Sequence, residues 1–169
     1  VITPSGYTSD NYAITFNTGT FTINAKAISA SDITVASLSN VTYKGTAYTP
    51  DPLVTDGTST LVLGTDYTLS YTNNTDAGTA TVTITGIGNY SGSRNVNFII
   101  TKKSLTVAAV NKSKLIGAAD PNLTVIYNGF VNGQNESVLT GTLVISRTAG
   151  ESMGTYTITA SGLTSTNYQ

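Results

Sequence analysis

The stretch GTATVTITGIGNY, residues 78–90, decides the fold class of this chain. Ala80, Val82 and Ile84 alternate with threonines, and successive side chains of a β-strand point to opposite faces of the sheet. The apolar side chains therefore share one face and the threonines share the other. This pattern predicts a strand with one face on a core and the other in water.

The composition of the whole chain also favours β structure. The chain has 169 residues, of which 39% are hydrophobic and 10% are charged, which is enough for one large or two small domains with packed cores. Thr, Val, Ile and Tyr suit a pleated, half-buried surface, and Gly, Asn and Asp suit its turns. We predict an all-β fold with at most one short helix.

Charge and residue usage exclude several classes of function. The formal net charge is −1 with eight Lys plus Arg, so we expect no nucleic-acid partner. The absence of His and Cys removes zinc sites of the usual kind and Ser-His-Asp hydrolysis. There is no apolar run of membrane-spanning length, so no membrane contact is expected in this segment. The first residues resemble the middle of a domain, and we expect the chain to be a piece of a longer protein.

A repeat links the two ends of the chain. Residues 157–169, TITASGLTSTNYQ, match residues 1–13, VITPSGYTSDNYA, at eight of thirteen positions without a gap. The offset is 156 residues throughout. In the first copy the match is followed by AITFNTGTFTINAK, which we read as a strand, an Asn-Thr-Gly turn and a second strand. The repeat predicts that one folding module is divided between the two ends.

A second internal sequence similarity indicates the boundaries between the parts of the chain. TFTINAK at 20–26 is similar to NFIITKK at 97–103, with Phe21 aligned with Phe98 and Ile23 with Ile100 at an offset of 77 residues. Both segments read as closing strands. We therefore predict three parts: residues 1–26 as the closing hairpin of a preceding unit, 27–103 as one domain, and 104–169 as a second domain that lacks its closing hairpin.

Strands are predicted within both domains, at 32–38, 47–55, 66–74, 78–87, 94–101, 104–110, 122–130, 141–148 and 154–162. Pro50 and Pro52 place their segment at a sheet edge, because proline cannot donate to a ladder. Residues 132–141 carry the one helical pattern, in which Asn132 or Asn135 caps a single turn that lays Val138 and Leu139 on the core.

Some clusters invite a functional reading, but each has a structural alternative that we favour. The loops 73–78 and 117–122 are rich in Asx residues, yet each offers one carboxylate, and turn chemistry explains them better than calcium does. Asp66, Glu136 and Glu151 are better read as surface carboxylates than as a glycosidase pair. The chain is accordingly expected not to be an enzyme, with no catalytic, cofactor-binding or metal-binding residues and no cofactor.

For the lysines and tyrosines, too, a functional role has to be weighed against a structural one. Lys44, Lys102 and Lys103 raise the hypothesis of intramolecular isopeptide bonds, which require contact that a sequence cannot show. Clustered tyrosines could form a carbohydrate platform, although cross-strand packing is their usual role in sheets. These tyrosines are Tyr43, Tyr48, Tyr67, Tyr71 and Tyr90.

Several motifs from 104 onward occur together in one family. They are a leading LTV, the G-x-x-D-P of GAADP, YNGFVNG, LTG, and GTYTITASG before NY. With these motifs residues 104–169, and through AITFNTGTFTI residues 1–26, resemble the MBG (mostly beta, glycine-rich) repeat of bacterial surface adhesins. One departure is KLIG at 114–117, where the family usually has Tyr-Gly. Residues 27–103, with YKGTAYTPDPLV and GTDYTLSYTNNTDAGTATVTITGIGNYSGS, resemble the Ig-like repeats of large bacterial cell-surface proteins. Together the two resemblances imply tandem sandwich domains, Ig-like or β-grasp-like.

The resemblance implies an extracellular, multi-domain rod on a bacterial cell surface that carries an adhesive tip. We expect a stalk or spacer segment, since the links at 26–31 and 102–104 are short. The alternative is a module that itself binds carbohydrate or a host protein. The expected partners are neighbouring repeats, and residues 1–26 of one copy are expected to complete 104–169 of another by head-to-tail strand exchange.

Overall fold

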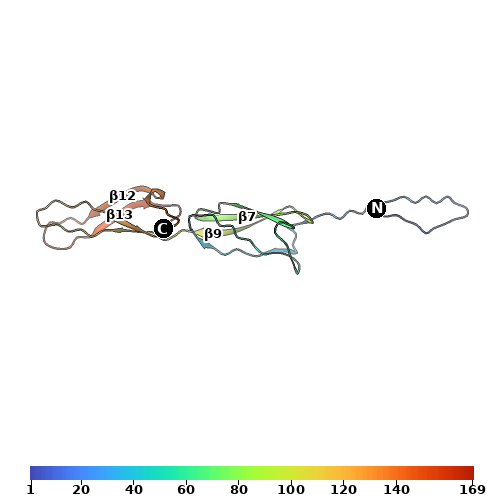
Figure 1. Cartoon of the computed structure of the whole chain (residues 1–169), viewed down its shortest axis with the longest axis horizontal. Helices are drawn as coiled ribbons and strands as arrows, with labels where there is room; N and C mark the ends of the chain where they lie inside the picture. The colour runs from blue at the N-terminus through green and yellow to red at the C-terminus, as the bar shows by residue number, and fades with distance from the viewer.

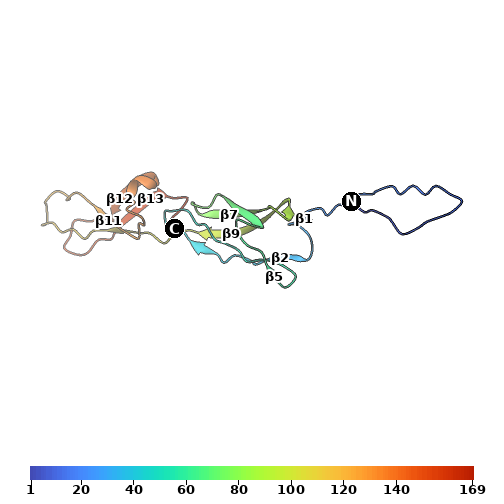
Figure 2. The ribbon, with the colours of Figure 1, turned by 45° about the vertical axis from the view of Figure 1, so that its right-hand side comes forward.

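The computed structural model describes residues 1–169 as an elongated molecule (Figure 1). Two β-rich units, which we call the central unit (27–103) and the C-terminal unit (104–169), lie end to end along the long axis. The N-terminal segment (1–25) extends from the far end of the central unit as a long open loop, and the C-terminus lies between the two units (Figures 1 and 2). The prediction of an all-β fold is confirmed, because the one helical element is a short 3₁₀ turn.

The main sheet of the central unit has four strands around the stretch quoted above. In spatial order they are β3 (Val41–Thr42), β9 (Ser93–Thr101), β7 (Gly78–Gly86) and β6 (Tyr67–Thr72). β7 is antiparallel to both β6 and β9, and β3 runs parallel to β9. Ala80, Val82 and Ile84 are fully buried, as their alternation predicts. Phe98 and Ile100 of β9 add to the same core face.

Smaller sheets cover this core. One contains β2 (Ile33–Val35), β4 (Val54–Asp56) and β5 (Ser59–Thr60), and the other pairs β1 (Lys26–Ala27) in parallel with β8 (Tyr90–Ser91). The predicted strand at 47–55 is shortened to its last residues, because Pro50 and Pro52 interrupt any ladder there. Pro52 is fully buried, so this segment packs on the core without joining the sheet as a strand.

The C-terminal unit consists of two separate strand pairs and a single helical turn. The pairs are β10 (Thr106–Ala109) with β11 (Val125–Asn128) and β12 (Thr140–Arg147) with β13 (Ile158–Thr164), both antiparallel. The turn is η1 (Glu136–Val138), and its cap is Asn135, whose side chain accepts a hydrogen bond from Ser137 N–H (2.9 Å). No helix of the chain is long and apolar enough to cross a membrane.

The C-terminal unit lacks an enclosed core. Within 104–169 only Tyr168 is buried, and that side chain packs against the central unit. Several large apolar side chains of the unit are instead exposed to solvent: Leu115, Ile116, Ile126, Val138, Val144 and Met153. Two strand pairs without a third layer cannot bury an apolar face on both sides.

The N-terminal segment has no partner for its apolar side chains. The strands expected at 12–26 are not formed before Lys26, and the backbone pairing of the segment is one antiparallel bridge between Ile2 and Gly19. Phe21 and Ile23 are 72% and 86% exposed. An isolated hairpin is marginal in water, so its sequence alone does not hold the ladder together.

Candidate functional site

The tyrosines considered for a carbohydrate platform are used inside the central unit. Tyr43 and Tyr67 are buried. The hydroxyl of Tyr67 donates to Asp51 Oδ1 (3.2 Å), and that of Tyr90 donates to Asp56 Oδ2 (3.1 Å). Burial raises the pKa of Tyr67 and of Tyr90 above the ordinary tyrosine value. These rings pack in or against the core instead of presenting an aromatic face to solvent.

The candidate carboxylates are not brought together. Asp66 accepts a hydrogen bond from Val62 N–H (2.8 Å) in a local turn of the central unit, and Glu136 lies in η1. Glu151 belongs to a cluster with Lys114 and other charged groups at the far end of the C-terminal unit. No group of three or more carboxylates is placed to hold a metal ion.

The lysines considered for isopeptide bonds have other contacts. The ammonium group of Lys44 lies 4.0 Å from the ring centroid of Tyr48, a cation–π arrangement. Lys102 Nζ donates to the carbonyl oxygen of Ser165 (2.7 Å). Lys103 takes part through its backbone in the junction between the two units.

That junction is held by a short parallel ladder of backbone hydrogen bonds. Lys103 N–H donates to Asn167 O, Gln169 N–H donates to Lys103 O, and Leu105 N–H donates to Gln169 O, all at 2.9 Å. The end of the C-terminal unit therefore runs parallel beside the segment that leaves the central unit. Three backbone hydrogen bonds close the link on itself and leave it little freedom to bend.

The Tyr168 side chain is buried inside the junction and contacts both units. It is 4% exposed and makes edge-to-face contacts with Tyr43 of the central unit (centroids 5.5 Å apart) and with Phe130 (5.4 Å). Its hydroxyl donates to the side chain of Gln134 and accepts from Val131 N–H (3.2 Å). Gln134 Nε2 donates to the Tyr43 hydroxyl (2.8 Å), so one polar network spans both units.

Asparagine side chains fasten the outside of the junction. Asn167 Oδ1 accepts from Ala77 N–H (2.8 Å), and Asn167 Nδ2 donates to Asp76 Oδ1 (2.9 Å). Asn132 Nδ2 donates to Gly45 O (3.0 Å) from the opposite unit. These hydrogen bonds join the surfaces of the two units beside the link, so bending that separates those surfaces breaks them.

A similar parallel backbone pairing occurs where the N-terminal segment meets the central unit. There Lys26 N–H donates to Asn89 O (2.9 Å) and Ile28 N–H donates to Ser91 O (2.8 Å), again in parallel. Each joint pairs a lysine with an Asn-Tyr dipeptide of the following unit. The Asn-Tyr pairs were visible in the sequence as part of the repeats, but their role in the joints was not predicted. The recurrence of an Asn-Tyr pair shortly before a closing strand is the sequence feature that could have indicated the joints.

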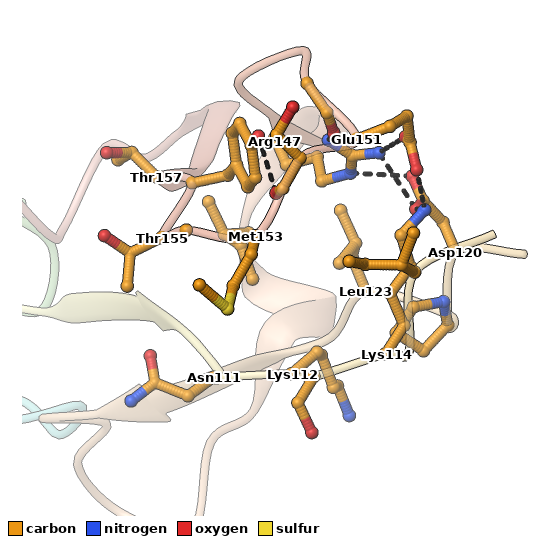
Figure 3. Close-up of a pocket in the computed structure, with 18 of the residues that line it drawn as sticks. Asn111, Lys112, Lys114, Asp120, Leu123, Arg147, Glu151, Met153, Thr155 and Thr157 are labelled. Carbon is orange, nitrogen blue, oxygen red and sulfur yellow. Dashed lines mark hydrogen bonds and ion pairs between the residues drawn. The ribbon is translucent and has the colours of Figure 1, made fainter. Parts of the chain in front are cut away.

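A cleft of about 680 Å³ opens at the far end of the C-terminal unit, lined mainly by the loops 111–123 and 150–157. Four charged side chains gather at one end of it, beside Leu123 (Figure 3): Lys114, Asp120, Arg147 and Glu151. Arg147 Nε and Nη2 both reach the Asp120 carboxylate, at 2.8 and 3.0 Å, and Lys114 Nζ lies 2.7 Å from it. Hydrogen bonds from Arg147 and then Lys114 lower the pKa of Asp120 to about 2.

Residues 105–169 match the model of one protein family, described as the MBG domain (YGX type). This segment is therefore similar to an MBG domain, and we use that name for it. The match confirms the predicted MBG resemblance for this segment. The MBG resemblance of residues 1–26 and the Ig-like resemblance of residues 27–103 stay predictions. It indicates a repeat segment of large surface proteins. No curated protein and no solved structure matches the chain.

The two ends of the MBG domain therefore differ in the contacts they make. Its near end is joined firmly to the central unit through Tyr168, and its far end holds the cleft and the charged cluster. At the point of departure from the family pattern, Lys114 supplies a cation to that cluster.

Proposed function

We propose that the chain is a stalk segment of an adhesin on the bacterial cell surface, which holds a distal binding region away from the cell. The observation that carries the proposal is the junction at Tyr168. A spacer transmits position only if its joints resist bending, and this joint combines a backbone ladder, a buried aromatic cluster and side-chain hydrogen bonds between the two units. The related joint at Lys26 supports a regular array of such units.

The stiffness of the joint can be measured by spin labelling, because the chain contains no cysteine. Labels on Thr58→Cys and Ser137→Cys report the distance between the two units. We expect a distance distribution as narrow as that of the control pair Thr58→Cys and Thr68→Cys within the central unit. A distribution several times broader than the control would mean a flexible joint and would contradict the stalk function.

The location at the cell surface has its own test. An antibody raised against the chain should label intact cells of the source organism. Labelling that appears only after the cells are lysed would contradict the surface assignment and leave the stiffness result standing.

The alternative function, a module that binds carbohydrate or a host protein, is favoured by the cleft of the MBG domain. Its volume of about 680 Å³ lies within the usual range of ligand pockets, and Arg147 and Tyr156 both line it. Against this reading, Arg147 is held by Asp120 and by Glu151 (2.5 Å), so its guanidinium is not free to take a ligand. Specific, saturable binding on a glycan array, lost in Tyr156→Ala, would favour the binding module over the stalk.

A further inference from the structure

Two edges of the MBG domain have unused backbone groups. In the β12–β13 pair Thr148 N–H donates to Thr157 O (2.9 Å), and bonded and non-bonded pairs alternate along antiparallel strands. The N–H and C=O groups of Ile158 and Ala160 therefore point away from β12. This edge of β13 can accept a further strand.

The edge of β10 has the same property. Val110 N–H donates to Thr124 O (2.9 Å) of the strand opposite, so by the same alternation the groups of Val107 and Ala109 point away from β11. They point to the side on which Gln169 already bonds Leu105. A strand that continued this ladder would lie along β10.

We propose that these two edges bind residues 14–26 of a second copy of this chain, so that copies associate head to tail. The proposal goes beyond the stalk function and does not depend on it. The repeat identifies the occupant: Asn11-Tyr12 repeats Asn167-Tyr168, and Ile14 to Lys26 follow it along the chain.

The occupant is residues 14–26 of the second copy. The hydrogen-bond ladder at the junction gives the register of its first strand against β10. The next position beyond Gln169 lies beside Leu105, and the 156-residue offset assigns it to Ile14. Two residues further, Phe16 lies beside Val107. Paired residues of parallel strands share a face, so Ile14 and Phe16 join the half-buried face of β10. The intervening threonine then faces solvent.

The pairing of β7 with β9 in the central unit gives the register of the second strand of the occupant. There the closing strand β9 pairs with β7, with Val96 opposite Val82. The sequence similarity between the closing strands puts Gly19 in the place of Val96. The alignment of GTYTITASG with GTATVTITG of β7 puts Ile158 in the place of Val82. The occupant therefore pairs antiparallel with β13, with Gly19 opposite Ile158.

An independent pairing in the structure gives the same register. Ile2 is the repeat counterpart of Ile158, and Ile2 N–H donates to Gly19 O (2.8 Å) while Gly19 N–H donates to Ile2 O (3.1 Å). The N-terminal segment thus already holds Gly19 against its own copy of the β13 sequence. The local turn is copied too, since Ser9 Oγ accepts from Tyr12 N–H and Ser165 Oγ from Tyr168 N–H, both at 3.2 Å. In the exchange Ile158 of the second molecule replaces Ile2.

The apolar side chains favour the exchange. Phe21 and Ile23 are mostly exposed, whereas their counterparts Phe98 and Ile100 in β9 are 3% and 1% exposed. The MBG domain exposes apolar side chains of its own, Met153 among them. Joining the two removes both surfaces from water.

The exposed area is large enough for a stable interface. The chain exposes 11360 Å². Two compact domains of half its mass would together expose about 9,500 Å². The excess is about 1,900 Å², and a stable protein interface buries about 1,200–2,000 Å² in total.

The donor and the acceptor cannot meet within one molecule. The N-terminal segment and the MBG domain lie at opposite ends of the long axis, with the central unit between them (Figures 1 and 2). A second copy therefore supplies the strands, and the contact is heterologous, so it builds open chains or rings.

Cysteine cross-linking of the full chain tests the register. Thr20 and Thr157 form a non-hydrogen-bonded pair in the proposed alignment, with a spacing that suits a disulfide. The double variant Thr20→Cys with Thr157→Cys should give a ladder of covalent oligomers under mild oxidation. The control Thr22→Cys with Thr157→Cys, two residues out of register, should remain largely without one. A monomer alone, or equal ladders from both variants, would overturn the proposal.

Association without a covalent bond is tested by light scattering across a concentration series. The wild-type chain should form oligomers, and Phe21→Ala with Ile23→Ala should weaken the association by at least about 100-fold, as expected for lost apolar burial. The control Thr20→Ala with Thr22→Ala alters the other face of the same segment and should associate like the wild type. Since these side chains are exposed in the single molecule, circular dichroism should be unchanged in both. A strict monomer at all concentrations, or equal association of the two variants, would refute the exchange.

Discussion

Replacing Tyr168 should uncouple the MBG domain from the central unit. The ring is almost completely buried between Tyr43 and Phe130. Burial of about 150 Å² of apolar ring at about 25 cal/mol/Å² is worth about 4 kcal/mol, and measured truncations of buried aromatics fall at about 3–5 kcal/mol. We expect Tyr168→Ala to cost about 3–5 kcal/mol of the free energy of unfolding of the MBG domain.

Tyr168→Phe separates the hydroxyl from the ring. This variant keeps the aromatic contacts but leaves Val131 N–H and the Gln134 side chain without their partner. A buried group left unpaired costs about 1–3 kcal/mol, so the loss should be smaller than for alanine.

Urea unfolding followed by tyrosine fluorescence measures both losses. Tyr12→Ala is the matched control, because Tyr12 is the repeat counterpart of Tyr168 but is 79% exposed. It should change stability by less than about 0.5 kcal/mol. If the alanine variants at the two positions were equally stable, the junction would not hold the units together and the reasoning would fail.

Other perturbations test the cores and the charged cluster. Ile84→Ala in β7 should cost about 2–5 kcal/mol and Ile99→Ala on the open face of β9 less than about 1 kcal/mol, as measured by urea unfolding. The pKa of Asp120 is about 2 in the folded chain against an ordinary value of 3.8, so its contribution is present above about pH 4 and is lost as the pH falls towards 2. The melting temperature of Asp120→Asn should therefore fall less steeply than that of the wild type across this interval, and equal slopes would contradict the role of the cluster. Gly150 has a φ of +150° and a Cβ there would overlap a tyrosine ring, so Gly150→Ala should destabilise the MBG domain by more than about 1 kcal/mol in thermal unfolding, whereas Gly154→Ala, which has open space, should not.

Local pattern predicted the strands that lie on a core. The alternation at 78–86 gave β7 with its bounds nearly correct, because its three apolar side chains need a single buried face. Of the two predicted caps, Asn132 and Asn135, the structure has Asn135, and the turn it starts is 3₁₀. The placement of Val138 on the core was wrong, because its side chain is exposed. In both places the signal lies within a few residues of chain.

Pairings between distant segments were beyond local pattern. The parallel pairing of β3 with β9 joins Val41 to Ile100, and nothing near either residue indicates the other. The four charged residues at the cleft were likewise not grouped in advance, because they come from two separate stretches of the chain, 114–120 and 147–151. The expected hairpin at 12–26 was wrong for the single molecule, since its apolar face has nothing to pack against.

The sequence by itself determined the all-β class, the MBG motifs and the repeat that relates the two ends. Each of these depends on residue order along the chain, through strand periodicity, turn chemistry and similarity at a fixed offset. Only the tertiary structure decided that the Asn-Tyr pairs form the joints, that the MBG domain has an open core, and that donor and acceptor lie at opposite ends. These features depend on which surfaces find a partner in space, and burial and backbone pairing between distant residues are settled only when the chain is folded.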